Sequence, residues 1–133
     1  MINRIDHIAI VVEDIEQALD VFRDALGLEL SHTQIIPEQG VKVACLPIGE
    51  SEIELLEPLS PDSGVGRFLA QRGGGMHHIC LEVEDIDAAL AELKGKGVRL
   101  INRRAVAGAH GRVAFLHPKS THDVLIELLE RSK

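Results

Sequence analysis

The sequence predicts an α+β fold in which two tandem βαβββ modules form a sheet-lined cup with the helices outside. One observation behind this prediction is an internal repeat, because Ile5–Leu19 (IDHIAIVVEDIEQAL) and Met76–Leu90 (MHHICLEVEDIDAAL) share one order of apolar, His and acidic residues. Another is that both copies close on the pentapeptide IELLE, at Ile53–Glu57 and at Ile126–Glu130. One copy is too short to bury a core alone, so we expect a single domain over residues 1–133.

The elements of module one, residues 1–60, follow from its apolar pattern. Ile5–Val12 is a β-branched run that predicts a buried strand, and Asp14 is placed to begin a helix that Gly27 ends. The turn at Pro37–Gly40 then separates further strands. These predicted strands are Leu28–Ile36, Val41–Ile48 and Ser51–Leu59.

A linker, residues 61–75, precedes module two, residues 76–133. The linker contains a short helical piece around Val65–Arg72 and ends on three glycines. Module two then repeats the order of module one, with a strand at Met76–Val83 and a helix at Asp85–Lys94. Its remaining predicted strands are Val98–Val106, Arg112–His117 and Thr121–Leu129.

Composition excludes several classes of partner. The net charge of −7, the absence of Trp and Tyr and a Phe count of three disfavour binding to nucleic acid or to a membrane surface. Cys45 and Cys80 each lie in an apolar run, which favours buried free thiols and a reducing compartment. No apolar run approaches the ~20 residues of a membrane span. We therefore expect a cytoplasmic protein.

The repeat places one histidine in each opening strand. Side chains alternate across a strand, so His7 and its repeat partner His78 take equivalent faces, whereas His77 points the other way. We therefore expect His78 to have the functional role and His77 to be its packed neighbour. A structural role for either histidine is the open alternative, because a single His in a strand is commonly a hydrogen-bonded structural residue.

Each closing strand carries a glutamate between aliphatic residues, Glu54 in module one and Glu127 in module two. Burying an unpaired carboxylate costs several kcal/mol, so such a residue must face water, pair with a donor or bind a metal. If the modules are related by a pseudo-twofold axis, two His and two Glu would converge. This donor set would neutralise one divalent cation and leave two octahedral positions for a chelating substrate.

The openings DHIAI and GMHHIC, with the endings IELLEP and LIELLE, resemble the vicinal oxygen chelate (glyoxalase/bleomycin-resistance/dioxygenase) superfamily over essentially the whole chain. Within it, PEQGV at Pro37–Val41 and FLHPKST at Phe115–Thr121 are similar to the methylmalonyl-CoA epimerase family. This resemblance implies the glyoxalase-like fold, a homodimer, an acyl-CoA thioester substrate and one divalent metal ion (Co, Mn, Mg, Zn or Ni) with no organic cofactor.

The resemblance also implies roles for individual residues. The metal ligands would be His7, Glu54, His78 and Glu127, with Glu54 at a position that is often Gln in the family. Glu38 would be the catalytic base that removes the α-proton, which gives a metal-stabilised enolate and interconverts the (R) and (S) epimers. An epimerase also needs an acid or base on the opposite face, and Glu127 is our own candidate for this second catalytic group. Apart from the resemblance, the phosphates of a coenzyme need cationic and polar partners, and we expect the substrate and CoA contacts to come from Gln39, Lys119 and Ser120.

Two other functions use the same fold. A glutathione-dependent glyoxalase (lactoylglutathione lyase) would need a similar His and Glu set. A non-enzymatic small-molecule binding protein would keep the cup without needing Glu38. PEQG and HPKS favour the isomerase.

Overall fold

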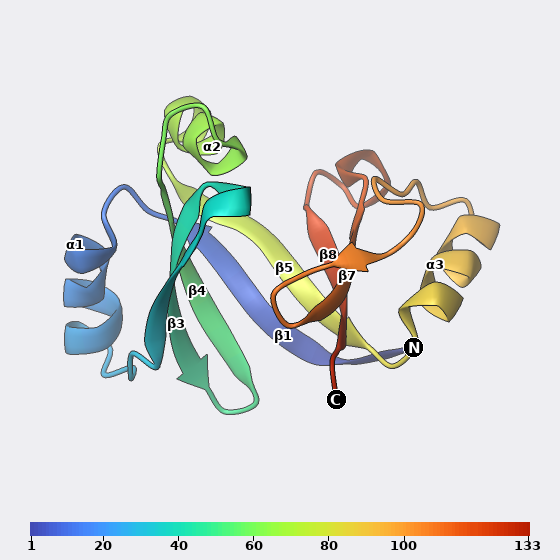
Figure 1. Cartoon of the computed structure of the whole chain (residues 1–133), viewed down its shortest axis with the longest axis horizontal. Helices are drawn as coiled ribbons and strands as arrows, with labels where there is room; N and C mark the ends of the chain where they lie inside the picture. The colour runs from blue at the N-terminus through green and yellow to red at the C-terminus, as the bar shows by residue number, and fades with distance from the viewer. The chain divides into compact units, whose positions relative to one another are not determined.

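The computed structural model describes the whole chain, Met1–Lys133, as two compact units (Figure 1). The module-one unit is His7–His77, and the module-two unit combines Met1–Asp6 with His78–Lys133. The boundary falls inside two strands, β1 (Ile2–Val11) and β5 (Gly75–Val83), so each of these strands contributes residues to both units. No helix of the protein is both long enough and apolar enough to cross a membrane.

The module-one unit is a sheet in the order β2-β3-β4-β1, in which β4 runs parallel to β1 and the other pairs are antiparallel. After β1 comes the helix α1 (Ile15–Leu19), which continues as a π-helical turn, η1 (Asp20–Ala25). The strands that follow are β2 (His32–Ile36), β3 (Val41–Ile48) and β4 (Ser51–Pro58). The helix α2 (Gly64–Arg72) lies in the predicted linker.

The two faces of the module-one sheet are covered by different helices. On one face, α1 packs through Ile15 and Leu19 against the buried Ala44, Leu46 and Leu55. On the other, α2 packs against a second apolar cluster, because neighbouring residues of a strand point to opposite faces. The buried members of that cluster are Ala9, Val11, Val41, Val43, Cys45, Leu56 and Val65.

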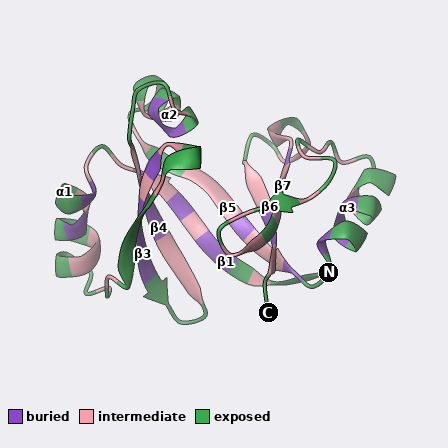
Figure 2. Cartoon of the chain, viewed as in Figure 1, coloured by how far each residue is buried: buried purple, intermediate pink, exposed green.

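The module-two unit repeats this order with a sheet in which β5, β8, β7 and β6 are neighbours. Here β8 (Ile126–Arg131) runs parallel to β5, as β4 does to β1 in module one. The helix α3 (Ile86–Gly95) covers one face, where its Ile86, Ala89 and Leu90 join a buried apolar cluster. The remaining strands are β6 (Val106–Ala107) and β7 (Gly111–Leu116). Buried residues line the inner sides of α1 and α3 (Figure 2).

The structure confirms the α+β class and the two βαβββ modules, but three predicted strands are too long. The predicted strand Leu28–Ile36 begins only at His32, because Leu28 and Leu30 pack into the core beside α1. Of the predicted strand Val98–Val106, only Val106 lies in a strand, β6, and Leu100 forms an isolated bridge with Leu116. Between these two points the Asn102 side-chain Oδ1, in place of a backbone carbonyl, accepts the hydrogen bond of the Phe115 backbone N at 2.8 Å.

The third difference lies before β8. The predicted strand Thr121–Leu129 begins at Ile126, because His122 and Asp123 adopt left-handed conformations with φ of 56° and 68°. Left-handed residues cannot continue an extended strand, and they form a turn instead. The two cysteines are free and buried, as predicted.

Candidate functional site

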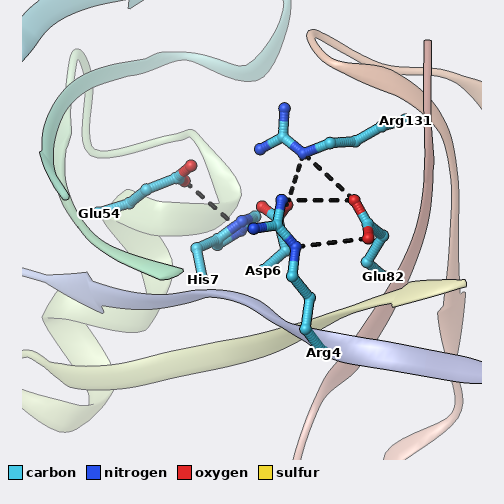
Figure 3. A network of polar contacts seen from close by, with 6 residues as sticks. All are labelled: Arg4, Asp6, His7, Glu54, Glu82 and Arg131. Carbon is cyan, nitrogen blue, oxygen red and sulfur yellow. Dashed lines mark hydrogen bonds and ion pairs between the residues drawn. The ribbon is translucent and has the colours of Figure 1, made fainter. Parts of the chain in front are cut away.

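His7 and Glu54 form a buried pair in the module-one unit. The parallel register of β1 and β4 sets Ala9 beside Glu54, and the His7 Nε2 atom lies 3.5 Å from Glu54 Oε1 (Figure 3). His7 is 6% exposed and Glu54 is 9% exposed. The Glu54 carboxylate, whose burial without a partner would cost several kcal/mol, therefore has the His7 imidazole as its neighbour.

His78 and Glu127 form the equivalent pair in the module-two unit. Their Nε2 and Oε1 atoms are 3.2 Å apart, and the parallel pairing of β5 with β8 sets Cys80 beside Glu127. The Phe115 ring from β7 meets the His78 ring edge-on, with the centroids 5.7 Å apart. Each unit thus builds one His–Glu pair with the same residues of the repeat.

Both pairs lie on the sheet face that is opposite to the helix following the opening strand. In module one, Leu55 faces α1, so Glu54 faces the other way. In module two, Leu128 packs with α3, so Glu127 also faces away from the helix. This placement is what the alternation of side chains along IELLE predicts.

His77 is placed apart from the pair that His78 forms. Its ring meets the Phe68 ring of α2 edge-on at a centroid distance of 5.0 Å, and the Arg72 guanidinium lies 5.1 Å from the centroid of the same Phe68 ring. His77 therefore packs against an aromatic side chain, as its assignment to the opposite face predicts.

A third carboxylate that sequence reasoning missed lies beside the module-one pair. Glu52 is directly opposite His7 in the β1–β4 register. One ligand atom of each of His7, Glu52 and Glu54 lies within 4.8 Å of the others. The signal was present in the sequence, because residues two apart on a strand share a face.

Glu38 and Gln39 lie in a 3-10 turn, η2 (Pro37–Gln39), between β2 and β3. Both side chains are exposed. The turn ends at Gly40, whose φ of 67° is left-handed and whose carbonyl accepts a hydrogen bond from Leu59 N at 2.8 Å. The turn that carries Glu38 is therefore fastened to the end of β4.

Lys119 and Ser120 lie in a second 3-10 turn, η3 (Pro118–Ser120), and differ in their availability. The Ser120 hydroxyl accepts a hydrogen bond from Arg99 N at 2.9 Å, which gives this residue a structural role. Lys119 is exposed. Of the two predicted coenzyme contacts, Lys119 is thus the accessible cation.

Arg112 has an acidic partner. Its guanidinium donates two hydrogen bonds to the Asp87 carboxylate, at 2.7 and 2.9 Å. This contact raises the pKa of Arg112 and lowers the pKa of Asp87.

The Cys45 thiol lies on β3 directly opposite Glu54. Burial, together with the negative charges of Glu54 and Glu52 as smaller causes, raises the pKa of Cys45 to about 12. The group is therefore a protonated thiol at neutral pH and not a thiolate.

A separate ionic network holds the start of β1 within the module-two unit (Figure 3). Asp6, which is 2% exposed, accepts a hydrogen bond from Arg131 Nε at 2.7 Å, and Arg4 Nε lies 3.4 Å from Glu82 Oε2. Two cations thus neutralise two carboxylates, so the buried Asp6 is compensated.

The chemistry of the His–Glu pairs fits a divalent cation. Imidazole nitrogen and carboxylate oxygen are both ligands of first-row divalent metals. Each pair points one Nε2 and one Oε1 at the same region of its sheet face.

Comparisons with known proteins agree with this fold. Residues 6–115 match the Glyoxalase/Bleomycin resistance protein/Dioxygenase superfamily. The chain belongs to this superfamily, as its repeated motifs predict.

Several of the relatives that the chain matches are named methylmalonyl-CoA epimerases. The chain is 44% identical to methylmalonyl-CoA epimerase, mitochondrial, of Mus musculus, over 96% of this chain and 72% of the relative. It is also 44% identical to ethylmalonyl-CoA/methylmalonyl-CoA epimerase of Cereibacter sphaeroides, over 96% of this chain and 98% of the relative. A Streptomyces coelicolor methylmalonyl-CoA epimerase in complex with 2-nitronate-propionyl-CoA superposes with a TM-score of 0.91 at 41% identity, covering 99% and 96% of the two chains.

Proposed function

We propose that the protein is an isomerase that interconverts the (R) and (S) epimers of methylmalonyl-CoA. The observation that carries this proposal is the pair of duplicated His–Glu sites in a chain whose relatives at 44% identity are named methylmalonyl-CoA epimerases. The reaction needs a proton to leave and return at the carbon between a thioester carbonyl and a carboxylate.

The proposed metal ligands are His7, Glu54, His78 and Glu127, which together hold one divalent cation. Support comes from their equivalent positions in the repeat, from the burial of His7 and Glu54, and from the superfamily. A cation bound there would supply electrostatic stabilisation for the negative charge that develops on the substrate oxygens. The metal could be Co, Mn, Mg, Zn or Ni.

Glu38 is the proposed base. Its carboxylate takes the α-proton and becomes a carboxylic acid, and the electron pair of the broken C–H bond is delocalised toward the thioester carbonyl. A proton delivered to the opposite face of the same carbon then gives the other epimer. We propose that Glu127 delivers it in its protonated form, and that proton exchange with solvent returns both carboxyl groups to their starting forms. The exposed turn at Pro37–Gln39 gives Glu38 access to a substrate that enters from solvent.

We propose that the exposed cation in the second 3-10 turn, Lys119, binds the coenzyme part of the substrate. Lys119 would pair with a phosphate of the acyl-CoA, with Gln39 as a further polar contact. Ser120 would contribute by holding the conformation of the turn, because its hydroxyl accepts a hydrogen bond from the backbone N of Arg99. We also propose that the protein works as a homodimer in the cytoplasm.

The experiment that tests the function follows the α-proton of one methylmalonyl-CoA epimer in deuterated water, with and without added metal. We expect deuterium at the α-carbon and formation of the other epimer by the metal-loaded protein. A glutathione hemithioacetal serves as the comparison substrate, because a glyoxalase would turn it over instead. Binding of the thioester without exchange would favour a binding protein.

A further inference from the structure

One segment of module two carries positive charge that the protein does not compensate. Residues 98–122 contain five Arg or Lys residues and no Asp or Glu, whereas the whole chain has a net charge of −7. Arg112 pairs with Asp87, but the side chains of the other four cations form no hydrogen bond or ion pair with a protein group. These four are Arg99, Arg103, Arg104 and Lys119. Unpaired cations gathered in an acidic protein favour an anionic ligand.

The backbone of Arg99 is fixed against the turn η3, which carries Lys119. Arg99 N donates a hydrogen bond to the Ser120 hydroxyl at 2.9 Å, and Arg99 O accepts one from His117 N at 2.9 Å. Both bonds use backbone atoms of Arg99, so its guanidinium takes no part in holding the turn. Arg99 and Lys119 are therefore two exposed cations at the same end of the module-two sheet.

Arg99 takes the sheet face that carries Glu127. Leu100 forms an antiparallel bridge with Leu116, and both leucines pack in the apolar cluster beside α3. Because neighbouring side chains point to opposite faces, Arg99 and Phe115 point away from α3. Phe115 lies directly opposite Glu127 in the β7–β8 register. A ligand that extends along this face can thus contact both Glu127 and Arg99.

The fold does not require a cation at this position. Gly97–Leu100, which follows the helix of module two, corresponds to Gly27–Leu30, which follows the helix of module one. The apolar residues of both segments pack in the cores of their units. The residue between them is Arg99 in module two and Glu29 in module one, and both are exposed. The positive charge is therefore a property of module two and not of the repeated framework.

We propose that Arg99 acts with Lys119 to bind the phosphate groups of the acyl-CoA substrate. This inference rests on the proposed function, which it deepens by adding a residue that selects the coenzyme-bound thioester. The coenzyme carries its phosphates on a long arm, so their contacts must lie apart from the metal ligands. Arg99 meets this condition, because it lies on the face of Glu127 but at the end of the sheet. Its guanidinium offers a fork of N–H donors that matches phosphate oxygens.

The first measurement is the affinity of the full-length protein for coenzyme A, by isothermal titration calorimetry. Arg99→Gln should weaken binding about 5–10-fold, between the effects of an exposed ion pair and of a hydrogen bond to a charged group. Arg99→Glu, which copies the residue of module one, should weaken it more, because a carboxylate repels phosphate. Arg99→Lys should retain part of the affinity, since it keeps the charge and loses the fork.

The matched control is Arg103→Gln. This substitution removes the same charge from another unpaired, exposed arginine of the same segment, and it should leave the affinity for coenzyme A near that of the wild type. The melting temperature of Arg99→Gln should also stay near the wild-type value, because the hydrogen bonds of Arg99 come from its backbone. A loss of affinity in Arg99→Gln is then not a loss of folding.

A second measurement compares two substrates in the exchange of the α-proton. One is methylmalonyl-CoA, and the other is the N-acetylcysteamine thioester of methylmalonic acid, which lacks the phosphates. Arg99→Gln should raise KM for methylmalonyl-CoA with little change in kcat, because it removes binding that the ground state and the transition state share. The preference for methylmalonyl-CoA over the short thioester, as a ratio of kcat/KM values, should fall about 5–10-fold.

The outcomes separate this inference from the proposed function. Wild-type affinity for coenzyme A in Arg99→Gln, with affinity lost in Lys119→Gln, would overturn the role of Arg99 and leave the epimerase function intact. Equal losses in Arg99→Gln and Arg103→Gln would also overturn it, because binding would then follow the total charge of the segment. If the wild type binds coenzyme A without exchanging the α-proton, the epimerase function fails, and weaker binding by Arg99→Gln would still support the inference.

Discussion

Glu57 on β4 accepts a hydrogen bond from the backbone N of Ile15, the first residue of α1, at 2.8 Å. Glu130 on β8 does the same for Ile86, the first residue of α3, at 3.0 Å. The closing pentapeptide IELLE therefore carries two glutamates with separate tasks. The first lies beside a histidine, and the last satisfies an amide at a helix N-terminus, where a negative charge is favourable.

Removing the capping carboxylate should destabilise the fold. We expect Glu57→Ala to lower the free energy of unfolding by about 1–2 kcal/mol, because an orphan amide at a helix start loses its acceptor. Urea denaturation measures this change. The matched control is Glu92→Ala, which removes only the exposed ion pair with Lys96 and should cost less than about 0.5 kcal/mol. Equal losses in the two variants would contradict the capping role.

Gly40 should be required for the placement of the turn that carries Glu38. Its φ is 67°, and a Cβ atom there would lie 2.8 Å from the Cβ of Ser63, the N-cap of α2. We expect Gly40→Ala to lower kcat as well as stability, because the turn must shift away from Ser63. Steady-state kinetics of epimerisation measure the effect.

Gly49→Ala is the control for backbone strain alone. Gly49 also has a left-handed φ, of 57°, but an added Cβ would meet no atom within 4 Å. This variant should lose about 1 kcal/mol of stability and keep its kcat. An unchanged kcat in Gly40→Ala would show that the Ser63 contact does not position the turn.

The sequence repeat was sufficient to predict the two modules, the faces of His7 and His78 and the separate packing of His77. Alternation along a strand is a local rule, and both units obey it. Strand ends depend on interactions that a pattern does not contain. Asn102 replaces a backbone partner with its side chain, and His122 adopts a left-handed φ that its residue type does not require.

The site was predicted less completely than the fold. Glu54 and Glu127 were visible because the repeat duplicates them. Glu52 was missed because the equivalent residue of module two is Leu125. A search for residues that the repeat duplicates does not find a carboxylate that occurs in one module alone. The engagement of Ser120 by Arg99 and of Arg112 by Asp87 depends on tertiary contacts that the sequence does not specify.

Metal content should distinguish the adjacent histidines. His78→Ala removes a proposed ligand and should lower the bound divalent metal by at least about 10-fold, whereas His77→Ala removes a ring that packs on Phe68 and should retain the metal. Elemental analysis after dialysis measures the bound metal. Loss of metal in His77→Ala alone would reverse the assignment.

The Asp87–Arg112 pair should give a small acid-dependent component of stability. Because Arg112 lowers the pKa of Asp87, this component is present above the ordinary Asp pKa and is lost as pH falls through the lowered value. Both side chains are exposed, so the effect should be small and screened by salt. Thermal melts of wild type and Arg112→Gln between about pH 2 and 5 should converge at the acid end. A constant difference across that range would contradict the pairing.

Glu38→Gln should lower the exchange rate of the substrate α-proton by about 10²-fold or more, because the amide cannot accept the proton. Metal binding and the unfolding midpoint should stay near the wild-type values, since Glu38 is exposed in its turn. The control is the double variant Glu38→Gln/Gln39→Glu, which moves the carboxylate by one position along the turn. This double variant should not regain exchange of the α-proton.

The most direct test of the account is the incorporation of deuterium at the α-carbon of a single methylmalonyl-CoA epimer by the metal-loaded wild-type protein. The account predicts exchange together with formation of the opposite epimer, and loss of both in His7→Ala and Glu38→Gln. Absence of exchange in a folded, metal-loaded wild-type protein would contradict it.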